Sequence, residues 1–593
     1  NPNDFNALVD LYKSGKTKEV EDGAKSLIKK FPKEIIIHNL LGAVYLEMKK
    51  LDLARKSFEK ALEINPRYSE AYNNLGIIFQ KKGKNKNAIS SYKKAIENNQ
   101  VFHKAHYNLA IAYQELGAFP DAIYHYKKTY EIDNNFGEAL INYWYLNQFC
   151  CDWKNQSQMK IELKKYINDC QSDNSKQCIK PFPLLSIFDD PELHFIASKL
   201  YSKNKIINVK KFNKTNSVNV DKKLRIAYVS SDFKNHPFSY LTAGLLENHN
   251  TDNFEIYCIS SSKNDKSDIQ NRIKRACKNF IDVSNKNNFE IAKLINDLSI
   301  NIIVDCGGYT KESKIELYSY LPNIPKIGFL GYPGTLGGNI NQYIIADKIV
   351  IPENQKINFS EKIIYLPDSY YPTDNKAKID KNPISRKECL LPKNSFVFCC
   401  FNQSYKITPE IFNTWMEILN QIENSVLWLM SSNKWAQSNL RQIASSKGIN
   451  KNRIIFAKKV SNQKHLSRIK NADLFLDTFP YNGHTTASDA LWSGLPLVTL
   501  SGKTFASRVS ASLLSSLDLN DLIASTEEEY ENLIFELTQK PEKLKEIKEK
   551  LKENKIKKPT FNTELFTKNI ELAYNKIYQR HLDNLPIDNL EIN

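Results

Sequence analysis

The sequence contains no Cys-x-x-Cys pair and no Asp-x-Asp pair. The first absence removes the usual signature of a structural zinc site. The second leaves no short pattern of carboxylates for holding a divalent metal. The 10 cysteines are irregularly spaced, which is not the pattern of a disulfide framework. We therefore expect free thiols, no metal site and a reduced compartment, the cytoplasm.

Long apolar runs are also missing. No stretch approaches the 18 or so apolar residues that a membrane-spanning helix needs. Residues 1–4 do not begin the apolar segment that a secretory signal peptide contains. The sequence therefore predicts no membrane span.

The chain of 593 residues is long enough for about three to five domain-sized units. Its 30 Phe, 30 Tyr and 6 Trp supply ample material for folded cores, so wholesale disorder is excluded. The 83 Lys and Arg exceed the 66 Asp and Glu, which gives a net charge of +17. These basic residues are spread over helices and linkers instead of being grouped with aromatic residues. We expect a lysine-rich surface and no nucleic-acid partner.

A repeat of 34 residues organises the N-terminal part. Five columns of small, apolar or aromatic residues recur at this interval: Gly42, Gly76 and Ala110; Ala54, Ala88 and Ala122; Phe58, Tyr92 and Tyr126; Leu41, Leu75 and Leu109; and Tyr45, Phe79 and Tyr113. The period and the pattern match the tetratricopeptide repeat, a helix–turn–helix unit. Residues 1–34 carry a degenerate copy. We predict a helical solenoid over residues 1–150 that binds protein or peptide partners, or that only supports the domain after it.

Residues 151–221 form a helical connector and a linker rich in Lys and Asn. Short apolar runs then alternate with helical patterns, first over residues 222–388 and again over residues 389–593. The expected strands are residues 224–230, 254–260, 301–306, 326–330, 343–346 and 362–366, and then 395–401, 425–430, 453–457, 474–477 and 497–500. Such alternation predicts two consecutive Rossmann-like α/β halves, the second with helices at its C-terminal end. Ligands of such sheets bind beyond the carboxyl ends of the strands.

The most informative segment is residues 476–486, where a strand ends, a turn containing Gly483 follows and a helix begins. Thr485 and Thr486 stand at the start of that helix, where free N–H groups and the positive end of the dipole favour a phosphate. Asp489, one turn later, is suited to accept hydrogen bonds from ribose hydroxyls. In the simpler alternative, Thr485 only caps the helix, which leaves His484 unexplained.

Three further segments follow predicted strands. Gln403 and Lys406 lie after residues 395–401, where one lysine suits a phosphate charge. His236 lies after residues 224–230 and has an ordinary pKa near neutrality, which suits a base or a polarising group. Leu330 and Gly331 begin a glycine-containing loop that lets a ligand approach the backbone. Each of these also has a purely structural interpretation.

Long motifs in this order resemble the O-linked N-acetylglucosamine transferase family, in a bacterial-type member. They occupy residues 224–241, 307–337, 401–429, 452–456 and 476–514, and the repeats extend the resemblance over nearly the whole chain. The resemblance implies a GT-B fold behind tetratricopeptide repeats. It also implies metal-independent, inverting transfer of N-acetylglucosamine from UDP-GlcNAc to Ser or Thr of proteins, with no cofactor besides the donor.

The resemblance also assigns roles to residues. His484, Thr485 and Thr486 match the diphosphate-binding turn, and Asp489 matches the ribose ligand. Gln403 and Lys406 match contacts to the nucleotide and its phosphates, with Lys406 stabilising the leaving group. His465 matches the residue that packs on uracil, His236 the active-site histidine, and Leu330 and Gly331 a loop near the sugar. Asn301 stands where relatives of the animal enzymes have a histidine.

Alternatives remain open at this stage. A related branch transfers fucose from GDP-fucose to proteins, and another relative glycosylates Asn side chains. A non-enzymatic alternative is a repeat scaffold with an inactive transferase domain, which the intact Lys406, His484 and Asp489 argue against.

Overall fold

The computed structural model describes residues 2–13, 16–212 and 223–593. Its contacts divide the chain into two compact units. The first contains residues 1–147 and 173–177, and the second contains residues 148–172 and 178–593. The expected boundary at residues 221 and 222, between connector and first α/β half, lies outside the described residues.

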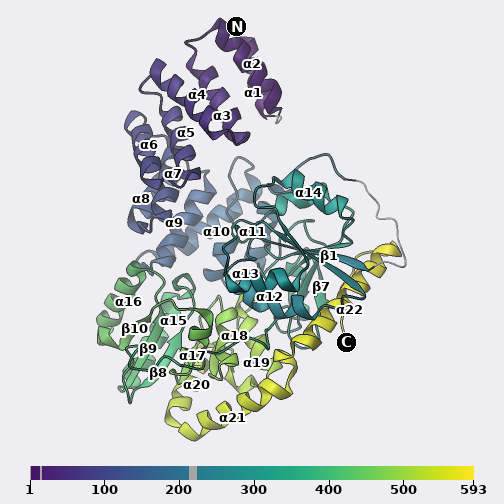
Figure 1. The fold of residues 1–593 in the computed structure, drawn as a ribbon. Coiled ribbons are helices and arrows are strands. Elements are labelled where there is room, and N and C mark those ends of the chain that lie inside the picture. The colour runs from purple at the N-terminus through teal and green to yellow at the C-terminus, as the bar shows by residue number, and fades with distance from the viewer. Residues whose placement is uncertain (1, 14–15, 213–222) are drawn as a thin grey trace. The chain divides into compact units, whose positions relative to one another are not determined.

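The first unit is built from helical hairpins, drawn in purple and blue in Figure 1. Helices α3 and α4, α5 and α6, and α7 and α8 pack as pairs, which confirms the predicted helix–turn–helix repeats. The bounds are α1 (Pro2–Lys13), α2 (Thr17–Lys30), α3 (Ile35–Glu47), α4 (Leu51–Ile64), α5 (Ser69–Lys81), α6 (Asn85–Asn98), α7 (His103–Glu115), α8 (Phe119–Ile132) and α9 (Gly137–Phe149).

Asparagine side chains link the first helices of neighbouring repeats. The amide of Asn74 donates to Oδ1 of Asn39 at 3.0 Å, and the amide of Asn108 donates to Oδ1 of Asn73 at 2.8 Å. These hydrogen bonds recur with the repeat because each joins one repeat to the next. The row of amides therefore helps to fix the stacking of the solenoid.

The first sheet of the second unit has eight parallel strands in the order β14-β7-β6-β5-β4-β1-β2-β3. The strands are β1 (Leu224–Ser230), β2 (Phe254–Ser260), β3 (Asn279–Asp282), β4 (Ile302–Asp305), β5 (Lys326–Gly328), β6 (Tyr343–Ala346), β7 (Lys362–Tyr365) and β14 (Leu590–Glu591). The intervening helices are α12 (Pro237–Asn248), α13 (Asp268–Ala276), α14 (Asn288–Asp297), η2 (Ile315–Tyr320) and η3 (Glu353–Asn358). Helices cover both faces of such sheets, which explains the continuous apolar runs of the central strands.

The second sheet has six parallel strands in the order β10-β9-β8-β11-β12-β13. They are β8 (Phe396–Cys400), β9 (Ser425–Met430), β10 (Ile454–Ala457), β11 (Leu474–Leu476), β12 (Leu497–Leu500) and β13 (Ile523–Ala524). The helices are η4 (Ser404–Lys406), α15 (Pro409–Gln421), α16 (Lys434–Ser446), η5 (Lys451–Arg453), α17 (Asn462–Ile469), α18 (Thr485–Trp492), η6 (Phe505–Ser507), α19 (Val509–Ser516), η7 (Asn520–Leu522), α20 (Glu527–Gln539), α21 (Pro541–Lys557) and η8 (Pro559–Phe561). The two sheets confirm the predicted pair of Rossmann-like halves.

The last helix, α22 (Thr563–Leu582), returns to the first sheet, although the sequence places it with the second half. It packs on α12, and in Figure 1 it runs in yellow beside β1 and β7. The hydroxyl groups of Tyr574 and Tyr228 share a hydrogen bond of 2.8 Å, and β14 then pairs with β7. Residues far apart in the sequence thus complete one sheet.

The connector supplies α10 (Gln156–Ser172), η1 (Phe182–Ser186) and α11 (Pro191–Lys203) to the second unit. Helix α11 packs closely against the loop after β5, since Gly337 lies against the backbone of Lys199. Within residues 2–13, 16–212 and 223–593, no helix is long and apolar enough to cross a membrane.

The close contact at Gly337 predicts a large effect of a single methyl group. Gly337 has φ +70°, and a Cβ there would overlap the backbone nitrogen of Lys199. We expect Gly337→Ala to lower the free energy of unfolding by about 2–4 kcal/mol, measured by urea denaturation of the full chain. Gly448→Ala is the control, because Gly448 has φ +83° with open space around it, and should lose only about 1 kcal/mol. Equal losses would contradict the proposed packing.

Candidate active site

A buried carboxylate organises the turn after strand β11. Asp477 accepts hydrogen bonds from the backbone N–H groups of Gly483 at 2.5 Å and Thr478 at 2.8 Å, and from the hydroxyl of Thr499 at 2.8 Å. The amide of Asn402, directly after β8, also donates to it at 3.2 Å. Burial raises the pKa of Asp477, an effect that the hydrogen bonds from Gly483, Thr499 and Thr478 oppose. Asp477 therefore folds the turn and ties it to the neighbouring strand.

Helix α18 begins at the end of this turn, and no side chain among the described residues caps its first N–H groups. His484 occupies the N-cap position, with φ −104° and ψ −89°, and its side chain makes no capping hydrogen bond. The alternative in which Thr485 caps the helix is therefore wrong, because Thr485 is already the first helical residue. Uncapped N–H groups and the helix dipole make this end of α18 suitable for an anion.

Lys406 brings a cation to the same turn. Its Nζ donates to the backbone oxygen of Asn482 at 2.7 Å and lies 3.6 Å from the centroid of the Tyr481 ring. The side chain is only 8% exposed, and this burial lowers the pKa of Lys406 to about 7, against the opposing effect of Asp477. A buried amine with this pKa gains or loses its proton near neutrality.

The two threonines of the turn have partners in different parts of the unit. Thr486 donates to Oδ1 of Asn402, and the hydroxyl of Thr485 lies 3.1 Å from that of Tyr371, in the segment after β7. The ring of His484 meets the ring of Tyr481 edge-on at 4.9 Å. Burial, and then Lys406, lower the pKa of His484 well below its usual range, so this imidazole is neutral.

Asp489 lies one turn into α18 and is partly exposed. It forms no hydrogen bond or ion pair with the part of the chain that the structure describes. Burial raises its pKa to about 7. Its carboxyl group is thus available to a ligand beside the N-terminus of the helix.

His465 packs on Phe401, the residue that follows β8, and Gln403 comes two residues later in the sequence. The ring of His465 on α17 meets the Phe401 ring edge-on at 5.0 Å, and its Nδ1 accepts a hydrogen bond from Arg468 at 3.2 Å. Burial and the Arg468 guanidinium lower the pKa of His465 to about 3, so the ring is neutral and suited to packing. Gln403 is exposed.

His236 caps helix α12 in the first half. Its Nδ1 accepts a hydrogen bond from the N–H of Phe238 at 3.3 Å and lies 3.9 Å from Oδ1 of Asp232. Burial lowers the pKa of His236, with Asp232 opposing this effect. Since Nδ1 is an acceptor, the proton of the neutral ring is on Nε2, which makes His236 a donor through that atom.

Leu330 and Gly331 follow β5. Leu330 has φ +70°, and a Cβ on Gly331 would overlap the backbone oxygen of Cys306, so this loop lies directly on the backbone after β4. No hydrogen bond or ring contact within the described residues joins Leu330, Gly331 or His236 to the cluster of Lys406 and His484. Among the predicted residues, the structure brings Lys406, His484, Thr485 and Thr486 together at the turn before α18.

Sequence reasoning missed Asn402, Asp477, Asn482 and Tyr371. Asn402 lies two residues after β8 and Asp477 directly follows β11, and such positions signal a site in an α/β sheet. Tyr371 has no local signal, because its partner Thr485 is 114 residues away in the sequence. Asn301 lies at the other end of its strand, where its amide donates to the hydroxyl of Tyr578 at 2.8 Å.

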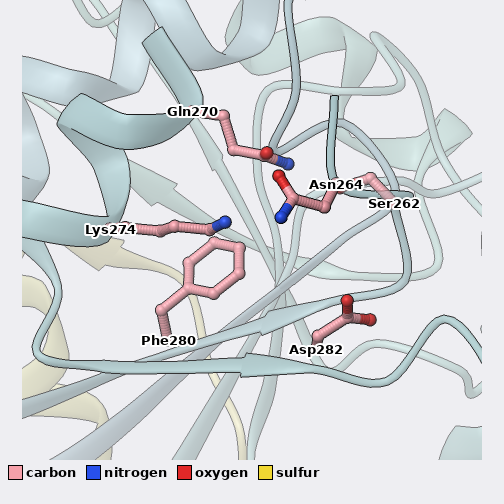
Figure 2. Close-up of a pocket in the computed structure, with 6 residues that line it drawn as sticks. All are labelled: Ser262, Asn264, Gln270, Lys274, Phe280 and Asp282. Carbon is pink, nitrogen blue, oxygen red and sulfur yellow. The ribbon is translucent and has the colours of Figure 1, made fainter. Parts of the chain in front are cut away.

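A separate cavity of about 410 Å³ lies in the first half, beyond β2 and β3. Figure 2 shows the Lys274 amine beside the Phe280 ring, facing the side chains of Gln270 and Asn264. None of the predicted site residues lines it. Over the described ranges, no group of three His, Cys, Asp or Glu residues is placed to hold a metal ion.

Comparison with known families identifies the chain. The sequence profile of glycosyl transferase family 41 matches residues 150–382 and 378–570, and that of a tetratricopeptide repeat matches residues 33–100 and 69–135. The chain belongs to glycosyl transferase family 41. Most of the second unit, including every predicted site residue, lies within the family 41 matches.

Curated relatives match most of the chain. The chain is 34% identical over 450 residues to the probable UDP-N-acetylglucosamine–peptide N-acetylglucosaminyltransferase SEC of Arabidopsis thaliana, covering 73% of this chain and 46% of the relative. It is 25% identical over 570 residues to the UDP-N-acetylglucosamine–peptide N-acetylglucosaminyltransferase of Caenorhabditis elegans, covering 75% and 49%. The chain thus spans about half the length of these relatives.

A solved structure shares the fold of this family 41 chain. A mutant of the Thermobaculum terrenum O-GlcNAc transferase matches with a TM-score of 0.66 at 20% identity, over 93% of this chain and 98% of that one. The architecture of repeats followed by two Rossmann-like halves is therefore that of a GT-B glycosyltransferase.

The buried Lys406 predicts a stability effect that depends on pH. Folded Lys406 loses its proton near pH 7, whereas an unfolded lysine keeps it until about pH 10.4. Between these values the folded state binds fewer protons, so the contribution of Lys406 to the free energy of unfolding rises with pH. We expect Lys406→Met to be more stable than the parent at pH 7, with a difference that shrinks towards pH 10.

Chemical denaturation between pH 6 and pH 10 measures this difference. Lys464→Met, at an exposed position on α17, is the control for the exchange of a lysine for a methionine. A constant difference for Lys406→Met would show that Lys406 does not titrate in this range.

Proposed function

We propose that this family 41 chain transfers N-acetylglucosamine from UDP-GlcNAc to Ser and Thr hydroxyls of proteins. The names of its relatives support this donor and a peptide acceptor. The observation that carries the proposal is the convergence of Lys406 and the uncapped N-terminus of α18 on one turn. Two positive groups at one place suit the diphosphate of a nucleotide sugar.

The proposed reaction is a single displacement in which an acceptor oxygen attacks the anomeric carbon and the configuration inverts. Negative charge develops on the departing diphosphate. Lys406, the hydroxyls of Thr485 and Thr486, and the N–H groups of α18 are fixed donors that would stabilise this charge without a metal. A bound diphosphate would also raise the pKa of Lys406, because an adjacent anion favours the ammonium form.

The remaining predicted residues receive proposed roles in binding. Asp489 would accept hydrogen bonds from the ribose, because its carboxyl group has no other partner among the described residues. Gln403 and the neutral His465 would contact the base and the nucleotide. In the first half, Leu330 and Gly331 would border the sugar.

His236 would act as a hydrogen-bond donor through Nε2. The N–H of Phe238 occupies Nδ1, so that nitrogen is not available to take a proton from the acceptor without losing the helix cap. An Nε2–H group is suited to orient an oxygen of the sugar or of the acceptor hydroxyl.

Two alternatives have less support. The names of the relatives do not favour fucose transfer from GDP-fucose or transfer of a hexose to Asn. An inactive scaffold does not explain why a lysine with a pKa of about 7 is kept in the interior, because such burial destabilises the fold.

A donor panel tests the proposal. The chain is incubated with UDP-GlcNAc, UDP-glucose or GDP-fucose and a mixture of acceptor proteins, and transfer is followed by mass spectrometry. We expect N-acetylglucosamine on Ser and Thr only, and Lys406→Ala should lower the rate about 100–1,000-fold while remaining folded. Selective use of GDP-fucose or modification of Asn would overturn the assignment, and a folded parent without transfer would favour the scaffold.

The cysteines suggest where the reaction takes place. All 10 are free thiols, and most of them are buried. We infer a reducing compartment, the cytoplasm.

The solenoid offers a groove for protein partners. A cavity of about 580 Å³ has Ile28 and Leu41 among its lining residues, and four lysines surround it: Lys25, Lys29, Lys56 and Lys60. Lys25 and Lys60 pair with glutamates at 2.6 Å, whereas Lys29 and Lys56 form no ion pair with any described residue. One repeat later, Glu59 and Glu63 replace Lys25 and Lys29, so the basic rim is not required by the repeat. We propose that this groove binds acidic segments of protein partners.

Binding of a labelled peptide tests the groove. We expect the double substitution Lys29→Glu and Lys56→Glu to weaken binding of a fluorescein-labelled 12-residue peptide of Asp, Glu and Leu by about tenfold or more, measured by fluorescence anisotropy. Lys86→Glu with Lys104→Glu is the control, because it changes the net charge equally at exposed positions outside the groove. Equal weakening by both pairs would contradict a specific groove.

A further inference from the structure

Asp189, in the connector between η1 and α11, is bound by a loop from the second half. Its carboxylate accepts hydrogen bonds from the N–H of Lys503 at 2.8 Å, the N–H of Thr504 at 2.9 Å and the hydroxyl of Ser507 at 2.8 Å. Gly502 allows this approach, because a Cβ there would lie 2.5 Å from Oδ2 of Asp189. The Asp189 side chain thus binds three residues of the loop at residues 502–507, after strand β12.

The opposite side of this loop holds the turn of the candidate active site. The backbone oxygen of Ala506 accepts a hydrogen bond from the N–H of Asn482 at 3.0 Å and lies 3.4 Å from Nε2 of His484. The backbone oxygen of Asn482 in turn accepts from Nζ of Lys406 at 2.7 Å. An unbroken series of contacts therefore leads from Asp189 to the proposed catalytic lysine.

A guanidinium completes the anchoring of the loop. Arg508 donates from Nη1 to the backbone oxygen of Gly502 at 2.6 Å and from Nε to that of Ile349 at 2.5 Å. The loop is thus held from the connector by Asp189 and from the first half by Ile349. The first anchor depends on the Asp189 carboxylate, and the second depends on the Arg508 guanidinium.

We infer that Asp189 is a positioning residue that sets the place of Lys406 and His484 through the loop at residues 502–507. The expected effect of Asp189 on the transfer rate rests on the proposed function, whereas its effect on the position of Lys406 does not. A carboxylate that satisfies several N–H and O–H groups at once holds a loop more firmly than a neutral side chain does. The connector is therefore part of the support of the donor site.

The neighbouring Asp190 provides a matched control. It accepts a hydrogen bond from the N–H of Leu193 at 3.1 Å as the N-cap of α11 and pairs with Lys164 at 3.3 Å. Asp189→Asn and Asp190→Asn each remove one carboxylate from adjacent positions, but only the first loosens the loop after β12. Ser507→Ala provides a second, milder variant should Asp189→Asn fail to fold.

Transfer kinetics with UDP-GlcNAc form the first part of the test. We expect Asp189→Asn to lower kcat at least tenfold with a smaller change in KM, because Lys406 acts on charge that develops in the transition state. Ser507→Ala should show the same pattern more weakly, and Asp190→Asn should stay within twofold of the parent. Equal effects of the two Asn variants, or a change in KM alone, would overturn the inference.

The second part needs no donor and separates this inference from the proposed function. The difference in melting temperature between each variant and the same variant with Lys406→Met is measured from pH 6 to pH 10. We expect the midpoint of this pH dependence to shift to lower pH in Asp189→Asn, because a displaced Asn482 oxygen no longer stabilises the ammonium. An unchanged midpoint would overturn the inference, whereas a shift in a chain without transfer would disprove only the proposed function.

Discussion

The Asp477 carboxylate lies among four hydrogen-bond donors directly after β11, and the remainder of the site is built around it. The carboxylate fixes the turn in which the backbone oxygen of Asn482 accepts a hydrogen bond from Lys406. This turn continues into the first residues of α18. Without this anion the buried N–H groups would lose their partners, at about 1–3 kcal/mol each. One buried acid therefore determines both the path of the turn and the direction in which the helix presents its positive end.

Burial shifts the pKa values of two ionisable side chains at this site. Lys406 and Asp489 are ionisable groups of opposite type, yet burial brings the pKa of each to about 7. Both groups are thus close to a change of charge near neutral pH. A ligand with a charged diphosphate and ribose hydroxyls would favour the charged form of each, so part of its binding energy would go into ionising its own partners.

Much of this architecture is readable from the sequence. The 34-residue period gives the solenoid, and the apolar runs give the central strands, because buried parallel strands need apolar residues on both faces. Strand β3 (Asn279–Asp282) escapes prediction, since it lies at an edge and its residues are half-buried or exposed. Within the site, His484 and the two threonines stand out locally, whereas Tyr371 and Asp189 matter through partners more than 100 residues away. Such contacts leave no periodic or short-range signal.

The pairing of β14 with β7 has a consequence for how the chain folds during synthesis. The backbone N–H of Ile363, in β7, donates a hydrogen bond to Oδ1 of Asn589, which lies 226 residues later in the sequence. At the usual rate of translation this distance corresponds to a delay of about 10–45 s. Throughout that interval β7 is an edge with unpaired backbone groups, the kind of surface that invites aggregation. The first sheet of the nascent chain can therefore be completed only after residues 589–591 have been synthesised.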